Sequence, residues 1–322
     1  MISFVYTSVY FTTSTYYFYD HLTMKKVYKY LVFFGIFLMS TFIALKLYHL
    51  SFIRQATEKT SQATIFAQPD TTEVFVVGTL HKTTDKVGYD DLYNLLETIK
   101  PNIILFEVDS THFDDKMNRK SKWRKMKLPP FLDILRQSNL EEVSVQKYLF
   151  HNKFAIVRPY EWSLRDRFHK ENHILTTPDK VFQKLDELNK ADKLDVNQKH
   201  ILENYYFLST ELEKFGDSTI YQINTLYQDS IARETQNAQY HKIKTIIDSN
   251  DSLKEFREFY KVNEAYWDIR NKAMAKNIQT FIKLFPKSRI VVLNGYYHRY
   301  YLRQELLDKQ QELNFKLLNV DR

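Results

Sequence analysis

The chain has 322 residues, of which 44% are hydrophobic and 26% charged, and its 46 basic and 39 acidic residues give a formal net charge of +7. This length is enough for one large or two modest domains with a sizeable core. Because basic and acidic residues are interleaved and no long basic block occurs, we predict no nucleic-acid partner. The chain has no cysteine, which excludes disulfides, cysteine nucleophiles and thiolate metal sites.

Near its N-terminus the sequence predicts a membrane anchor at residues 30–50. Three lysines in "MKKVYK" precede an uncharged, mostly apolar run over residues 30–45. A cleaved signal has an apolar core of about 7–15 residues and a spanning helix has ~20, so this run lies between the two. Lys46 is able to snorkel, which extends the segment, and no A-x-A cleavage pattern follows. We predict a single-pass signal anchor with the following domain extracytoplasmic, because the lysines precede it. The alternative is a secreted or periplasmic protein released by signal cleavage.

The anchor separates an N-terminal segment, residues 1–29, from a polar linker at 51–70 and a domain at 71–322. Residues 1–23 differ in composition from everything that follows, so we expect Met24 to be the true start.

The domain has the pattern of an α/β fold. A β-rich run at 73–77, the amphipathic helix "DDLYNLLETIK" and the apolar run "NIILFE" form a βαβ unit. "FAIVRPYEW" and "RIVVLNG" predict two more strands, and "YLRQELLDKQQEL" a final helix. Residues 178–285 have a helical pattern throughout, with Gly216 as the expected break. We therefore predict a mostly parallel sheet core with flanking helices and a long helical insertion.

Two of the five glycines stand at matching places. Gly78 in "VVGTLH" and Gly295 in "LNGYYH" each end an apolar run, and each lies three positions before a histidine, His81 or His298. Because glycine is so rare here, we expect both to occupy backbone sites closed to other residues. Ligands bind at the carboxyl ends of parallel strands, so we expect the two histidines to converge there.

Three further residues are candidates for the same edge. Glu107 closes "NIILFE", Glu161 follows the strand in "FAIVRPYEW", and Arg270 lies on a mostly apolar helical face, where a buried cation needs an anionic partner. Neutral histidine is a base near pH 7 and a metal ligand, and a neighbouring glutamate ligates, orients or shuttles a proton. Turn formation, loop capping and a structural salt bridge are the alternative roles of these residues.

The motifs "GTLH", "ILFEVD", "RNKAMAKNI" and "VVLNGYYH" resemble those of the TraB/GumN/PrgY family. That family belongs to a superfamily with the Tiki metalloproteases, erythromycin esterases and ChaN-like haem-binding proteins. The resemblance spans about residues 72–310. It implies a site made of His81, Glu107, Glu161, Arg270 and His298, with structural roles for Gly78, Gly295 and Asn271. One departure is "KTT" after "GTLH", where the family often has a valine and a serine, so Thr83 or Thr84 is expected to supply the hydroxyl.

This resemblance implies a hydrolase acting on a peptide or a small-molecule ester. His81, Glu107 and His298 would bind a divalent metal (Mn, Zn or Co) or activate water directly, while Arg270 stabilises negative charge and Glu161 assists. One alternative is a non-catalytic haem- or peptide-binding protein on the same fold, with the tyrosines of "GYYH" as haem ligands. Another is an interaction module whose working surface is the helical insertion, which is also placed to act as a lid over the sheet edge. The sequence carries no signal for the oligomeric state.

Overall fold

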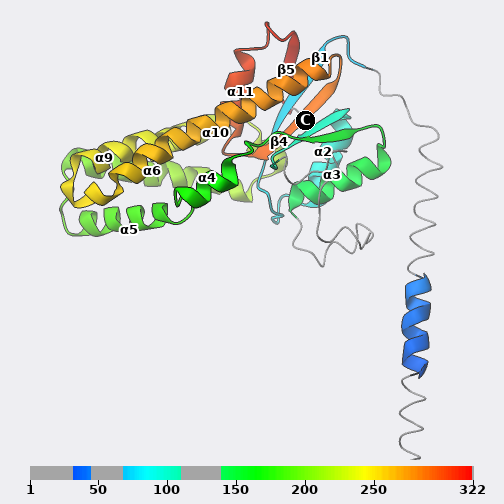
Figure 1. Ribbon diagram of the computed structural model, residues 1–322, viewed down its shortest axis with the longest axis horizontal. Helices are drawn as coiled ribbons and strands as arrows, with labels where there is room; N and C mark the ends of the chain where they lie inside the picture. The colour runs from blue at the N-terminus through cyan, green and yellow to red at the C-terminus, as the bar shows by residue number, and fades with distance from the viewer. Residues whose placement is uncertain (1–31, 45–67, 110–138, 321–322) are drawn as a thin grey trace, which may run out of the picture. The chain divides into compact units, whose positions relative to one another are not determined.

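The computed structural model of the chain describes residues 32–44, 68–109 and 139–320 (Figure 1). The chain divides into two units, residues 1–63 and 64–322. In the first unit the described residues form one helix, which exposes most of its apolar side chains.

That helix covers the middle of the predicted anchor. Among the described residues, no helix has both the length and the apolar character needed to cross a membrane. The two ends of the predicted anchor, the segment 1–29 with its expected start at Met24, and most of the predicted linker lie outside the described residues. The anchor therefore stays a prediction.

In the second unit, five parallel strands form one sheet in the order β3-β2-β4-β1-β5. The strands are β1 (Thr72–Thr79), β2 (Ile103–Phe106), β3 (Ile156–Pro159), β4 (Arg289–Gly295) and β5 (Phe315–Leu318). The central strands are apolar on both sides, which is typical of parallel strands covered by helices on each face. The predicted α/β class with a parallel sheet is confirmed. The edge strand β5 was not predicted, because its four residues follow a helical pattern without a clear break.

Helices account for most of the remaining described residues. They are α2 (Tyr89–Ile99), α3 (Leu140–His151), α4 (Arg165–Glu171), α5 (Thr177–Lys190), α6 (Val196–Glu213), α7 (Ile220–Ile223), α8 (Leu226–Asn237), α9 (Ile243–Ser249), α10 (Arg257–Leu284) and α11 (Arg299–Leu307). Short 3-10 turns at Lys214–Asp217 and Asp251–Phe256 and a π-helical turn at Ala238–Lys242 join some of them. Gly216, the expected break, lies in the first of these turns.

The two faces of the sheet carry separate hydrophobic cores, because successive residues of a strand point to opposite sides. On one face, Val77 packs with Leu92 of α2 and Tyr148 of α3. On the other, Val76 packs with Met274 of α10 and with residues of α11. The carboxyl ends of the strands therefore lie between two helical layers.

A third core lies away from the sheet, in a helical arm. Helices α5, α6 and α9 pack around the N-terminal part of α10 through residues such as Val181, Leu202, Ile246 and Tyr260. Figure 1 shows α10 running from this arm to the sheet. Tyr205 of α6 packs against the same core, so this part of the helical insertion contributes to folding of the arm.

Candidate active site

A cavity of about 330 Å³ opens at the carboxyl ends of β1, β2 and β4. Four of the five residues predicted for catalysis lie in its wall: His81, Glu107, Arg270 and His298. The register of the central strands explains why they meet, because Gly78 and Thr79 of β1 pair with Asn294 and Gly295 of β4, and Phe106 of β2 with Leu293. Residues more than 200 positions apart in the chain thus follow neighbouring strand ends.

The two glycines are needed for close approach and not for an unusual backbone angle, since neither has a positive φ. A Cβ on Gly78 would lie 3.0 Å from Cα of Tyr296, and a Cβ on Gly295 would lie 2.7 Å from Nε2 of His81. Each glycine of one motif therefore makes room for the other motif. The residue in the left-handed region is His81 itself, with φ of 58°.

This difference in neighbours predicts different effects of two alanine substitutions. Gly78→Ala is expected to destabilise the fold by about 1–3 kcal/mol, because its methyl group meets the backbone of Tyr296. Gly295→Ala meets only the tip of the His81 ring, so the ring is expected to move while the stability falls by less than about 1 kcal/mol. Urea unfolding and the NMR titration of His81 measure the two effects. Equal destabilisation by both substitutions with an unchanged His81 resonance would contradict this geometry.

Arg270 is the centre of a buried ionic network. Its Nη2 donates to Glu107 Oε1 at 2.7 Å and to Glu161 Oε2 at 2.5 Å, and its Nε donates to Glu161 Oε1 at 3.1 Å. Burial alone would lower the pKa of Arg270, but Glu161 and Glu107 outweigh it and raise the pKa above its usual value. The arginine is therefore permanently charged, and the anionic partner expected for it from the sequence is a pair of glutamates.

Both glutamates have their remaining oxygens occupied as well. Glu107 Oε2 accepts from the backbone N–H of Gly295 at 2.6 Å. Glu161 accepts from the backbone N–H of Trp162 at 2.8 Å and from Nη1 of Arg165 at 3.0 Å. Glu161 does not line the cavity and reaches it only through the two arginines.

His298 is held neutral inside this network. Its Nδ1 lies 2.8 Å from Oδ1 of Asn271, and its Nε2 lies 2.8 Å from Nη1 of Arg270. Since Arg270 only donates, Nε2 accepts and Nδ1 carries the proton. The ring also stacks on Trp267, with 4.6 Å between centroids. Burial first and the charge of Arg270 second place the pKa of His298 well below its usual value. This environment therefore does not support His298 as a proton carrier.

His81 differs from His298 in both its exposure and the direction of its pKa shift. Its side chain is 51% exposed, while Nδ1 lies 2.7 Å from Oε1 of Glu141, a buried carboxylate on α3. Thr79 donates its hydroxyl to the same oxygen. Burial would lower the pKa of His81, but the hydrogen bond and charge of Glu141, helped by Glu107, raise it above its usual value.

Glu141 fixes which ring nitrogen of His81 is free. Burial would raise the pKa of Glu141, yet its bonds to His81 and Thr79 lower it, so the carboxylate is ionised and only accepts. Nδ1 of His81 therefore donates, and Nε2 presents its lone pair on the cavity side next to Gly295. An imidazole oriented by a carboxylate in this way is the arrangement of a general base.

The donor atoms predicted to hold a metal do not fit that task in this arrangement. Nε2 of His298 and Oε1 of Glu107 both face the Arg270 guanidinium, which fills the position a cation would take. Across residues 32–44, 68–109 and 139–320, no group of three or more histidine and acidic side chains is arranged to hold a metal ion.

Several residues at the site were missed by the sequence analysis. Glu141 lies 60 positions from His81, on a helix that follows a region with no strand signal. The start of this helix is visible in the sequence, because Asn139 caps it as the "SNLEE" pattern suggests. Arg165 stands four positions after Glu161, a spacing typical of helical ion pairs. The hydroxyl near His81 belongs to Thr79, whereas Thr84 accepts from the backbone of Val87 in a turn.

Comparison of the chain with protein-family models, with curated proteins and with solved structures gives no match. The resemblance to the TraB/GumN/PrgY family therefore stays a prediction based on the four short motifs.

Proposed function

We propose that the chain is a hydrolase of carboxylic esters or peptides, in which His81, oriented by Glu141, activates water as a general base. The observation that carries this proposal is the 2.7 Å contact between Nδ1 of His81 and a buried carboxylate, while Nε2, on the cavity side, has no hydrogen-bond partner among the described residues. The motif resemblance favours the same reaction class.

The reaction begins with a water molecule between His81 Nε2 and the substrate carbonyl. Nε2 takes a proton from the water while its oxygen attacks the carbonyl carbon, and the negative charge of Glu141 stabilises the imidazolium. The carbonyl oxygen becomes an oxyanion, and the guanidinium group of Arg165 supplies positive charge in the cavity wall. When the tetrahedral intermediate collapses, His81 returns its proton to the leaving alcohol or amine.

Arg270, Glu107, Glu161 and His298 have a supporting role in this proposal. Their polar atoms bond to one another and to the backbone, so the network fixes Gly295 and with it the wall opposite His81. Such preorganisation is needed because a catalytic group displaced by about 1 Å loses much of its effect.

Turnover measurements with and without a chelator test the proposal. The purified chain is expected to hydrolyse members of an ester and a peptide panel, and EDTA is expected to leave the rate unchanged. A His81→Ala protein prepared in the same way controls for contaminating hydrolases. Absence of turnover on both panels would overturn the proposal and favour the binding alternative, and a rate abolished by EDTA and restored by Mn, Zn or Co would reassign His81, Glu107 and His298 as metal ligands.

We also propose the location that the N-terminal pattern predicts. Residues 30–50 would anchor the chain in a membrane with the α/β unit on the extracytoplasmic side, or act as a signal that is removed before secretion or release into the periplasm.

A further inference from the structure

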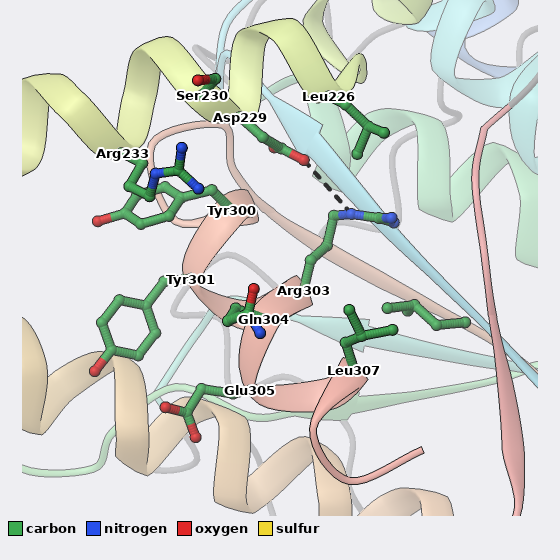
Figure 2. A pocket seen from close by; sticks show the side chains of 11 residues that line it. Leu226, Asp229, Ser230, Arg233, Tyr300, Tyr301, Arg303, Gln304, Glu305 and Leu307 are labelled. Carbon is green, nitrogen blue, oxygen red and sulfur yellow. Dashed lines mark ion pairs between the residues drawn. The ribbon is translucent and has the colours of Figure 1, made fainter. Parts of the chain in front are cut away.

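A second cavity, of about 480 Å³, lies between α8 and α11, with Leu317 of β5 also in its wall. Figure 2 shows Asp229 and Leu226 of α8 facing Arg303 and Leu307 of α11, with Tyr300 and Tyr301 along the same side as Arg303. None of the residues proposed for hydrolysis lines this cavity. Its volume is that of a site for a small organic molecule.

Buried positive charge exceeds buried negative charge beside this cavity. Asp229 Oδ2 lies 2.5 Å from Nη1 of Arg299 and 3.5 Å from Nε of Arg303, so its charge is neutralised mainly by Arg299. Arg303 keeps one neutral partner, Asn319, at 2.8 Å from its Nη2. Among the described residues, Nη1 of Arg303, Nη2 of Arg299 and Oδ1 of Asp229 are buried without a hydrogen-bond partner. A buried cation with a free donor is stabilised by an anion that enters next to it.

Burial disfavours the charged forms of Asp229, Arg299 and Arg303. Burial lowers the pKa of Arg303 and of Arg299, in each case against the attraction of Asp229. The remaining arginine of the lining, Arg233, is largely exposed and pairs with Glu234 at 3.4 Å, so it adds charge at the surface. Glu305 also lies in the wall, as the second carboxylate of the lining.

The other walls of the cavity are apolar or aromatic. Leu226 is 64% exposed and Leu307 is 55% exposed, and both border the cavity. Tyr300 stands beside them with its hydroxyl occupied by a hydrogen bond from Nε1 of Trp267 at 3.2 Å, which leaves its ring as the surface it offers to a ligand. A ligand that fits these walls has an apolar body with one anionic end.

We propose that the cavity between α8 and α11 binds a small organic carboxylate, with the carboxylate at Arg303 and the apolar body against Leu226, Leu307 and Tyr300. Guanidinium groups recognise carboxylates with paired N–H donors, and Arg303 is the mostly buried arginine that lines the cavity. This site is independent of the proposed hydrolysis.

Calorimetric titration of the full-length chain tests the proposal with hexanoate as the probe. We expect a Kd of about 1 mM or tighter. Hexanamide has the same shape as hexanoate without the charge and is expected to bind at least about tenfold more weakly than hexanoate. Inorganic phosphate lacks the apolar body and is also expected to bind at least about tenfold more weakly than hexanoate. Equal binding of hexanoate and hexanamide, tighter binding of phosphate, or no binding of hexanoate at 10 mM (about tenfold above the expected Kd) would overturn the proposal.

Two sets of variants locate the probe. Arg303→Gln is expected to weaken hexanoate binding about tenfold or more, whereas Arg167→Gln, on the exposed face of α4, is expected to leave it unchanged. Because Arg303→Gln also removes the contact with Asn319, a second pair of variants leaves the buried charged residues unchanged. Leu226→Glu places a carboxylate in the cavity wall, and Leu226→Gln has the same side-chain shape as glutamate without the charge. Hexanoate is expected to bind Leu226→Gln at least about tenfold more tightly than Leu226→Glu. Equal affinity within that pair would place the probe elsewhere.

Discussion

Replacing Glu141 by glutamine is expected to lower kcat for hydrolysis by about 10²- to 10⁴-fold and to move the acidic limb of the pH profile to lower pH. The glutamine amide is free to donate to Nδ1 of His81, which would put the ring proton on Nε2 and remove the base. It also lacks the charge that stabilises the imidazolium during the reaction. The measurement is kcat against pH from about 5 to 9 for both proteins.

The direction of the pH shift follows from the pKa of His81. In the native chain, burial lowers that pKa, but the hydrogen bond and charge of Glu141 outweigh burial and raise the pKa above its usual 6.5. His81 works as a base only when neutral, so activity rises as the pH passes upward through this raised pKa. Without the Glu141 charge, burial dominates and the pKa falls, which moves the rise in activity to lower pH. A Glu141→Gln enzyme with native kcat and an unshifted profile would show that His81 is not the base.

The same pair makes the stability of the fold depend on pH. A histidine whose pKa is raised on folding stabilises the protein fully below its unfolded pKa, and this contribution is lost as the pH rises through the folded pKa. The contribution of His81 is therefore fully present below its usual pKa of 6.5 and is lost as the pH rises from there through the raised pKa. Glu141→Gln is expected to abolish this stabilisation at low pH, because the pKa of His81 is then no longer raised.

Replacing Arg270 by methionine is expected to destabilise the fold by about 3–5 kcal/mol, the largest effect of any single change at the site. Methionine fills similar volume but leaves the carboxylates of Glu107 and Glu161 buried without their shared cation. It also removes the donor to Nε2 of His298. Urea unfolding measures the loss as a lower midpoint at an unchanged slope.

A matched control and a rescue separate this effect from the loss of any arginine. Arg167→Met breaks an exposed ion pair with Glu171 and is expected to cost less than about 1 kcal/mol. Adding Glu107→Gln and Glu161→Gln to Arg270→Met removes the unpaired charges, so the triple variant is expected to be more stable than Arg270→Met alone. A cost of less than about 1 kcal/mol for Arg270→Met would contradict a closed ionic network.

The sequence predicts those features of the fold and the site that depend on residues close together in the chain. The strand "RIVVLNG" and the helix around Leu92 follow from local periodicity, and the apolar face around Arg270 predicts a buried cation with an acidic partner. The scarcity of glycine predicts that Gly78 and Gly295 are sterically constrained, and their neighbours bear this out. These inferences need only short windows of sequence or a simple count.

The sequence does not predict which residue of the site has which role. Glu107 and His298 have the right residue types for metal binding or proton transfer, yet both are engaged by Arg270, and this depends on side-chain geometry. Glu141 was missed because nothing in a single sequence links a helix residue to a histidine 60 positions away. The short strand β5 was missed because its pairing with β1 is a tertiary contact.

The central place of β4 has a consequence for biosynthesis. This strand begins at residue 289, yet it separates β1 from β2, which have no pairing of their own in the sheet. A nascent chain that has not yet released this segment from the ribosome lacks both the middle of its sheet and the Gly295 surface against which the His81 ring rests. Products of premature termination before residue 289 should therefore be degraded or aggregate rather than retain partial activity, because the sheet that positions the site residues lacks its central strand.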